Sequence, residues 1–175
     1  MNIYLFRHGQ TVYNADGERF CGSSDVGLTA LGWQQARQAA TMVRHVKLTK
    51  MIHSGLRRAA ETAQAIREAQ PHLADADVEI HSGFREVGFG AWEGLTRAEV
   101  TRSFPELYAR WLIDPTKAPI PGGDDLYERQ REAMAAVERT RGRGDRHRCP
   151  QHAQSVVAHG TVGRRSAGLS AHCAG

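Results

Sequence analysis

Short apolar segments alternate with helix-forming segments along most of the chain, and this alternation constrains the fold more than any other feature. The candidate strands are brief and end in polar or Gly-containing turns; they cover residues 3–6, 51–54, 78–81 and 156–158. Longer helical patterns separate them, at residues 29–46, 56–69 and 124–140. Such alternation is typical of an α/β domain with a largely parallel sheet.

Local signals predict where the helices begin. Thr29 is a suitable N-cap for the first long helix, because its hydroxyl can accept from an unpaired backbone amide. We expect the apolar side of that helix to contain Leu31, Ala36, Ala39, Ala40 and Val43. Thr96 and Glu99 form a capping box that opens a further helix, which Pro105 should interrupt or restart.

Length and composition indicate a single globular domain. The chain has 175 residues, of which 41% are hydrophobic and 24% charged. Its mean hydropathy is −0.49, and no apolar run approaches the ~20 residues of a membrane helix. The N-terminal segment lacks the basic region of a signal peptide. Cys21, Cys149 and Cys173 form an odd set without a Cys-x-x-Cys pair, so we expect a reducing cytoplasmic location. From the lack of a long apolar run we expect no membrane contact.

The net charge of +4 belongs to the C-terminal segment. Residues 1–140 hold 17 Lys and Arg against 18 Asp and Glu, so they offer no basic surface for nucleic acid. Residues 141–175 hold six Arg against one Asp and contain no Ile, Phe, Met, Trp or Tyr. We interpret this atypical segment either as a disordered basic arm or as the product of two reading-frame slips that flank residues 155–160.

Arg7, His8 and Gly9 directly follow the first candidate strand, where open α/β sheets bind their ligands. An arginine offers a rigid fork of donors to a phosphate, and a glycine lets a ligand approach the backbone. The imidazole of His8 could act as a base, a metal ligand or a nucleophile. A surface arginine beside a histidine at the core edge would explain the tripeptide equally well, so the tripeptide alone leaves its role open.

A longer motif that includes this tripeptide favours the functional interpretation over the structural one. Arg7-His8-Gly9-x-Thr11-x-x-Asn14 resembles the signature of the histidine phosphatase superfamily, also called the phosphoglycerate mutase-like family. Further segments agree with this family in order and spacing: Asp25-x-x-Leu28-Thr29-x-x-Gly32, Ser54-x-Leu56-x-Arg58-Ala59-x-x-Thr62, Arg85-Glu86, Phe89-Gly90-x-Trp92-Glu93-Gly94, Pro121-Gly122-Gly123 and Val157-Ala158-His159-Gly160. The resemblance implies one domain over residues 1–175, folded as a three-layer α/β/α sandwich with a mostly parallel sheet.

The same resemblance implies roles for the residues that carry it. His8 would attack phosphorus and become a phosphohistidine, while Glu86 would protonate the leaving alkoxide and later activate water. Arg7, Arg58 and His159 would complete the catalytic set by clamping the phosphoryl group electrostatically, so no metal ion is expected. The expected substrate-binding residues are Arg7, Thr11, Asn14, Cys21, Gly22, Arg58 and His159.

Three functions remain open from the sequence. The first is a metal-independent phosphomonoesterase of the α-ribazole phosphatase type, which needs no cofactor and acts on a small phosphorylated metabolite. The second is a cofactor-dependent phosphoglycerate mutase, which would require 2,3-bisphosphoglycerate and tends to have a longer chain. The third is a non-catalytic relative that binds phosphorylated ligands. In each case we expect a monomer or a homodimer.

Overall fold

The computed structural model describes residues 2–144 and 154–158, and for residues 141–144 and 154–158 it describes the backbone alone. A sheet of four strands forms its centre: β1 (Asn2–Phe6), β2 (Lys50–His53), β3 (Val78–Ile80) and β4 (Gln154–Ala158). The strand order is β1-β4-β2-β3, and each neighbouring pair is parallel. The parallel sheet predicted from the alternation is therefore confirmed.

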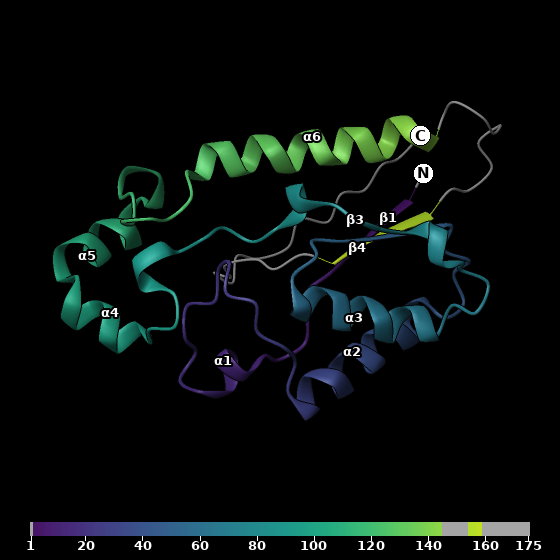
Figure 1. Ribbon diagram of the computed structural model, residues 1–175, viewed down its shortest axis with the longest axis horizontal. Helices are drawn as coiled ribbons and strands as arrows, with labels where there is room; N and C mark the ends of the chain where they lie inside the picture. The colour runs from purple at the N-terminus through teal and green to yellow at the C-terminus, as the bar shows by residue number, and fades with distance from the viewer. Residues whose placement is uncertain (1, 145–153, 159–175) are drawn as a thin grey trace, which may run out of the picture.

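Helices lie on both faces of this sheet. The described helices are α1 (Val12–Ala15), α2 (Ala30–Val43), α3 (Arg57–Glu68), α4 (Arg97–Ser103), α5 (Pro105–Ile113) and α6 (Leu126–Gly144). Figure 1 shows α2 and α3 on one face, α6 across the other, and α4 with α5 beyond one end of the sheet. This is the expected α/β/α sandwich. None of the described helices is long and apolar enough to cross a membrane.

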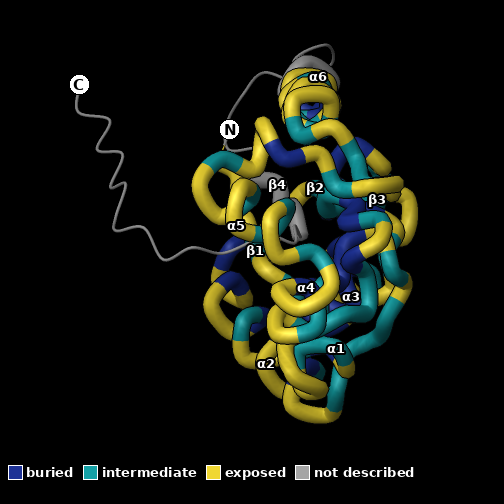
Figure 2. The backbone as a smooth tube through the Cα atoms, turned by 90° about the vertical axis from the view of Figure 1, so that its left-hand side faces the viewer, coloured by how far each residue is buried: buried dark blue, intermediate teal, exposed yellow. Residues whose placement is uncertain are grey.

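The two faces of β2 are buried in two separate hydrophobic clusters. Met51 is fully buried among residues of α2 and α3, including Val43 and Ile66. Ile52 points to the opposite face, where it packs with Phe84 and with Ala136 of α6. This alternation follows from the period of two in a strand. Figure 2 shows the buried segments running through the middle of the molecule, with the exposed turns of the helices around them.

The buried side of α2 differs from the expected one at its first turn. Ala36, Ala40 and Val43 are buried as predicted, but Leu31 is 47% exposed and Gly32 is buried in its place. Gly32 lies four residues before Ala36, so it continues the buried stripe, whereas Leu31 is turned away from it. The hydrophobic pattern predicted Leu31 at the buried position of this turn. That position is crowded, and Gly32, the smallest residue, occupies it.

The N-terminus of α2 packs directly against the loop that follows β1. A Cβ atom on Gly9 would overlap the carbonyl group of Gly32, and one on Gly32 would overlap the carbonyl oxygen of Gln10. Thr29, the observed N-cap, also holds this loop, because its amide donates to the Gln10 carbonyl oxygen over 2.9 Å. Two glycines therefore allow the backbones to touch.

The ends of the four strands lie in register, and this brings the sequence motifs together. Phe6 is paired with Ala158, Ala158 with His53, and His53 with Ile80. The segments that follow these residues therefore leave the sheet at one common edge. His159 directly follows Ala158 but lies outside the described residues, as does most of the atypical C-terminal segment.

Gly32→Ala tests the contact between α2 and the loop after β1. Alanine favours a helix over glycine by about 1 kcal/mol, but the added Cβ would overlap the Gln10 carbonyl oxygen. We expect a net loss of about 1–3 kcal/mol in the free energy of unfolding, measured by urea denaturation. Gln34→Ala, at an exposed position of the same helix, is the control and should change it by less than about 0.5 kcal/mol. Equal stability of the two variants would contradict the close approach.

Candidate active site

His8 lies directly after β1, and one of its ring nitrogens is committed to the backbone. Its Nδ1 is 2.7 Å from the carbonyl oxygen of Gly9. Because a carbonyl oxygen only accepts, Nδ1 must carry the proton in this arrangement. The lone pair of the neutral ring is then on Nε2, which makes Nε2 the nucleophilic nitrogen.

A buried hydroxyl joins the His8 loop to the first turn of α3. The amide of Gly9 donates to Thr62 Oγ1 over 3.3 Å, and Thr62 Oγ1 donates to the Arg58 carbonyl oxygen over 2.8 Å. Thr62 is fully buried, so water does not compete for these bonds. The position of His8 is thereby coupled to that of Arg58, a role for Thr62 that its place in the motif did not reveal.

Arg58 is almost completely buried, with 1% of its surface exposed. A buried guanidinium is costly unless it is paired. Its Nη1 donates to the Ser24 carbonyl oxygen over 2.8 Å, and its Nη2 donates to the Gly22 carbonyl oxygen over 2.6 Å. Nη2 also donates to Glu86 Oε2 over 2.7 Å. These three bonds use three of the five N–H groups and fix the plane of the fork.

Glu86 reaches Arg58 from the segment that follows β3. A short 3₁₀ helix, Ser82–Phe84, turns the chain back towards the sheet edge just before this residue. The Glu86 side chain is 11% exposed and forms an ion pair with Arg58. The structure therefore brings together two of the residues that the sequence placed in one site, although they are 28 positions apart.

The loop that carries Cys21, Gly22, Ser23 and Ser24 lies between Arg58 and Glu93. Glu93 Oε1 accepts from the amide and hydroxyl of Ser23, both over 2.7 Å, and Oε2 accepts from Ser24 Oγ over 2.6 Å. Burial alone would raise the pKa of Glu93, but the hydrogen bonds from Ser24 and Ser23, with one from the Phe89 amide, hold it below its usual value. Glu93 is therefore ionised at neutral pH.

Cys21 is buried beside this charged group. Burial raises the pKa of its thiol to about 11, and the negative charges of Glu86 and Glu93 act in the same direction, against the opposing effect of Arg58. The thiol is therefore protonated at neutral pH and is a poor nucleophile. Its expected contact with substrate stays a prediction.

Thr11 and Asn14 bond chiefly to each other. Thr11 is the N-cap of α1 and is fully buried; its hydroxyl and its amide both donate to Asn14 Oδ1, over 2.9 and 3.0 Å. The backbone amide of Asn14 donates to Thr11 Oγ1 over 3.2 Å, so its side-chain Nδ2 is the donor that could reach a ligand. Direct substrate contact by either residue stays a prediction, as it does for Arg7, which is exposed.

Residues 121–124 contact the segment around Glu86, residues 85–91. The amide of Ala91 donates to the Pro121 carbonyl oxygen over 2.9 Å, and the amide of Gly88 donates to Asp124 Oδ2 over 2.8 Å. Asp124 also forms an ion pair with Arg85 over 3.4 Å. The Pro121 carbonyl oxygen and the Asp124 carboxylate thus hold the chain around Glu86 in place.

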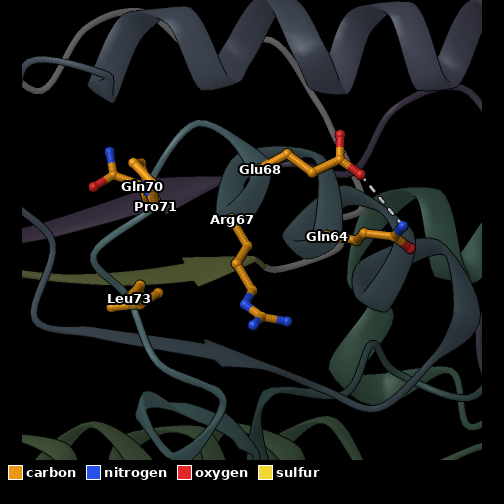
Figure 3. Close-up of a pocket in the computed structure, with 6 residues that line it drawn as sticks. All are labelled: Gln64, Arg67, Glu68, Gln70, Pro71 and Leu73. Carbon is orange, nitrogen blue, oxygen red and sulfur yellow. Dashed lines mark hydrogen bonds between the residues drawn. The ribbon is translucent and has the colours of Figure 1, made fainter.

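A separate hollow of about 340 Å³ lies at the opposite end of α3. Figure 3 shows the side chains that line it: Gln64, Arg67, Glu68, Gln70, Pro71 and Leu73. Arg67 is paired with Asp75, and Gln64 donates to Glu68 over 3.3 Å. The hollow contains none of the predicted site residues. Within residues 2–140 the structure has no group of three or more His, Cys, Asp or Glu side chains that could hold a metal ion.

Comparison with curated proteins finds relatives with mixed descriptions. A "bifunctional protein" of Mycobacterium tuberculosis is 40% identical over 139 residues, which are 77% of this chain and 36% of the relative. The "probable phosphoglycerate mutase GpmB" of Escherichia coli is 35% identical over 142 residues, 81% of this chain and 63% of the relative. The chain thus spans about a third to two thirds of the length of these relatives.

Solved structures with the same fold include phosphatases. The α-ribazole phosphatase of Shigella flexneri superposes with a TM-score of 0.77 at 26% identity, covering 91% of this chain and 74% of that one. A mycobacterial glucosyl-3-phosphoglycerate phosphatase, in complex with VO₃, gives a TM-score of 0.74 at 30% identity, covering 89% and 74%.

The family comparison agrees with the geometry of the site. Residues 3–168 match the model of the histidine phosphatase superfamily, branch 1. The matched region contains every motif from Arg7-His8-Gly9 to the segment that ends at Gly160. The chain therefore belongs to the histidine phosphatase superfamily, whose members are phosphatases or mutases.

Proposed function

We propose that the protein is a metal-independent phosphomonoesterase that hydrolyses a small phosphorylated metabolite through a phosphohistidine at His8. The observation that carries this proposal is the buried Arg58 fork, which is paired with Glu86 and joined through Thr62 to the His8 loop. A nucleophile, an electrophilic clamp and a carboxyl group are the three parts that a two-step phosphoryl transfer requires. The structure supports the proximity of these parts.

The chemistry of the first step follows from the tautomer of His8. The Nε2 lone pair forms a bond to phosphorus while the bond from phosphorus to the alkoxide oxygen breaks. Glu86, a carboxylate in its ion pair with Arg58, must take up a proton before this step; the alkoxide then takes that proton and the alcohol leaves. The Gly9 carbonyl oxygen accepts from the N–H of His8 Nδ1, so it stabilises the positive charge that develops on the ring.

In the second step, water replaces the alcohol. Glu86, now a carboxylate, takes a proton from water, whose oxygen attacks phosphorus as the bond to Nε2 breaks. The products are phosphate and neutral His8. The negative charge on the phosphoryl oxygens is stabilised in both steps by the guanidinium of Arg58, with Arg7 and His159 proposed as further members of the clamp.

A phosphoglycerate mutase is the second candidate, favoured by the similarity to the Escherichia coli GpmB. A mutase would return the phosphoryl group from His8 to a bound sugar acid, so it must keep water from the phosphohistidine. The phosphatases among the solved structures favour hydrolysis, and the names of those two phosphatases suggest α-ribazole phosphate and glucosyl-3-phosphoglycerate as substrates to test first.

Phosphate release from a generic aryl phosphate tests the proposed function. The phosphatase proposal predicts turnover without 2,3-bisphosphoglycerate and no change on addition of EDTA, because guanidinium groups provide the charge that a metal ion would otherwise supply. Activity that requires 2,3-bisphosphoglycerate would favour the mutase. Loss on chelation with recovery on addition of Mg²⁺ or Zn²⁺ would contradict the metal-independent mechanism, and binding without turnover would indicate a non-catalytic relative.

His8→Ala removes the proposed nucleophile. We expect phosphate release to fall by about 10³-fold or more, because water alone is a poor substitute for a positioned imidazole. The wild-type protein should become labelled on histidine during rapid-quench mass spectrometry, and the variant should not. Near-normal turnover by the variant would rule out the covalent route.

Glu86→Gln removes the proposed acid but keeps an oxygen that can accept from Arg58. We expect kcat to fall by about 10²-fold or more while KM changes little, because the proton transfer is lost and the clamp remains. Steady-state kinetics on substrates with leaving groups of different basicity provide the measurement. The loss should be greatest for the most basic alkoxide. A rise in KM with unchanged kcat would instead assign Glu86 to substrate binding.

A further inference from the structure

We propose that Glu93 is a positioning residue for the phosphate clamp, acting through the Cys21–Ser24 loop to hold the fork of Arg58. This inference rests on the proposed function for its catalytic consequence, but its structural part can be tested without turnover. The Glu93 carboxylate accepts from Ser23, Ser24 and Phe89, and its proposed action on the reaction runs through the groups that these residues position.

Four donors converge on the carboxylate of Glu93. Its Oε1 accepts from the Ser23 amide, from Ser23 Oγ and from the Phe89 amide, the last over 3.0 Å. Its Oε2 accepts from Ser24 Oγ. An ionised carboxylate has about four lone-pair sites, and four donors converge on this one, three of them on Oε1. A side chain without these oxygens, such as alanine, would leave all four donors without this acceptor.

Three of these donors lie in the Cys21–Ser24 loop. Ser23 is held at both its amide and its hydroxyl, and it stands between Gly22 and Ser24. The carbonyl oxygens of Gly22 and Ser24 are the two backbone acceptors of the Arg58 fork, one for each terminal nitrogen. Fixing Ser23 therefore fixes both carbonyl groups, and with them the plane of the guanidinium.

The same carboxylate also holds the segment that follows Glu86. Phe89, whose amide donates to Glu93, follows Glu86 by three residues, and Glu86 itself bonds Arg58. The contacts form a closed ring that runs from Glu93 through the Cys21–Ser24 loop to Arg58, on to Glu86, and back through Phe89. Glu93 joins the loop to the Phe89 amide, because its Oε1 accepts from both Ser23 and Phe89. Removal of Glu93 therefore opens the ring at this point.

Gly22 shows how tightly the carboxylate fits. It has a φ of +51°, and a Cβ at this position would overlap both Glu93 Oε1 and the Phe89 amide nitrogen. A side chain on Gly22 would therefore push the Glu93 carboxylate away from the loop. Gly22→Ala is thus a second way to break the same junction, with a substitution on a different segment.

The kinetic test compares Glu93→Ala with Glu99→Ala. Glu99 is a matched control, because its carboxylate also accepts from backbone and side-chain donors, here the amide and hydroxyl of Thr96 and a nitrogen of Arg19, but it has no bond to the Cys21–Ser24 loop. We expect Glu93→Ala to lower kcat/KM for an aryl phosphate by about 100-fold, mainly through kcat, because a misplaced fork stabilises the transition state poorly. Glu99→Ala should stay within about threefold of the wild type, since surface changes away from the site have small effects.

Rescue by a conservative variant separates positioning from general folding. Glu93→Gln keeps one oxygen that can accept from Ser23 and Phe89, so it should recover most of the activity, to within about tenfold of the wild type. Gly22→Ala should reproduce the loss seen in Glu93→Ala, and the double variant should lose little more than either single one. Additive losses in the double variant would overturn the proposed common junction.

A second readout does not depend on catalysis. In a Cys149→Ser/Cys173→Ser background, Cys21 is the remaining thiol, and its burial should make it react slowly with Ellman's reagent. Glu93→Ala should speed this reaction by about tenfold or more by loosening the loop, as local opening exposes buried groups. Glu99→Ala in the same background should leave the rate unchanged.

The two readouts distinguish the failure of each proposal. If the wild type releases no phosphate but Glu93→Ala still exposes Cys21, the proposed function fails and the structural role of Glu93 stands. If Glu93→Ala keeps the wild-type kcat/KM, or leaves the Cys21 reaction as slow as in the wild type, the positioning role is wrong. Equal kinetic losses in Glu93→Ala and Glu99→Ala would likewise assign the effect to general destabilisation.

Discussion

The buried charge of Arg58 is the constraint on which the site depends. A guanidinium that is removed from water must find a carboxylate and a full set of acceptors, or the fold that buries it is destabilised. Here the acceptors come from two different segments, the Glu86 segment and the loop that contains Gly22 and Ser24. The need to satisfy one side chain therefore holds together three parts of the chain that are distant in sequence.

The sheet makes this convergence possible. Because the strands end in register, the segments after β1, β2 and β3 begin at one edge and need only short turns to meet. Thr62 then links the His8 loop to α3, and Gly9 with Gly32 lets that loop lie directly on α2. Helix packing and site geometry are thus parts of the same set of contacts.

Much of this could be predicted from the sequence, because local patterns determine it. The strands, the N-cap at Thr29 and the capping box at Thr96 all appear where the residue types indicated. The roles of Thr62 and Glu93 could not be predicted in this way, since each depends on donors brought together only by the tertiary fold. The prediction that Leu31 is buried was wrong, because the hydrophobic pattern carries no information on backbone contacts. Here the contact between α2 and the loop after β1 requires a glycine at the next position, Gly32.

The ion pair between Arg58 and Glu86 also affects how the site attracts its ligand from a distance. Opposite charges 2.7 Å apart act as a dipole, whose field falls off much faster than that of a single charge. Residues 1–140 carry nearly equal numbers of acidic and basic side chains, so they add little long-range attraction. An anionic ligand would therefore experience Arg58 mainly at close range, and this residue would contribute to the lifetime of the complex more than to the rate of encounter, with little dependence on ionic strength.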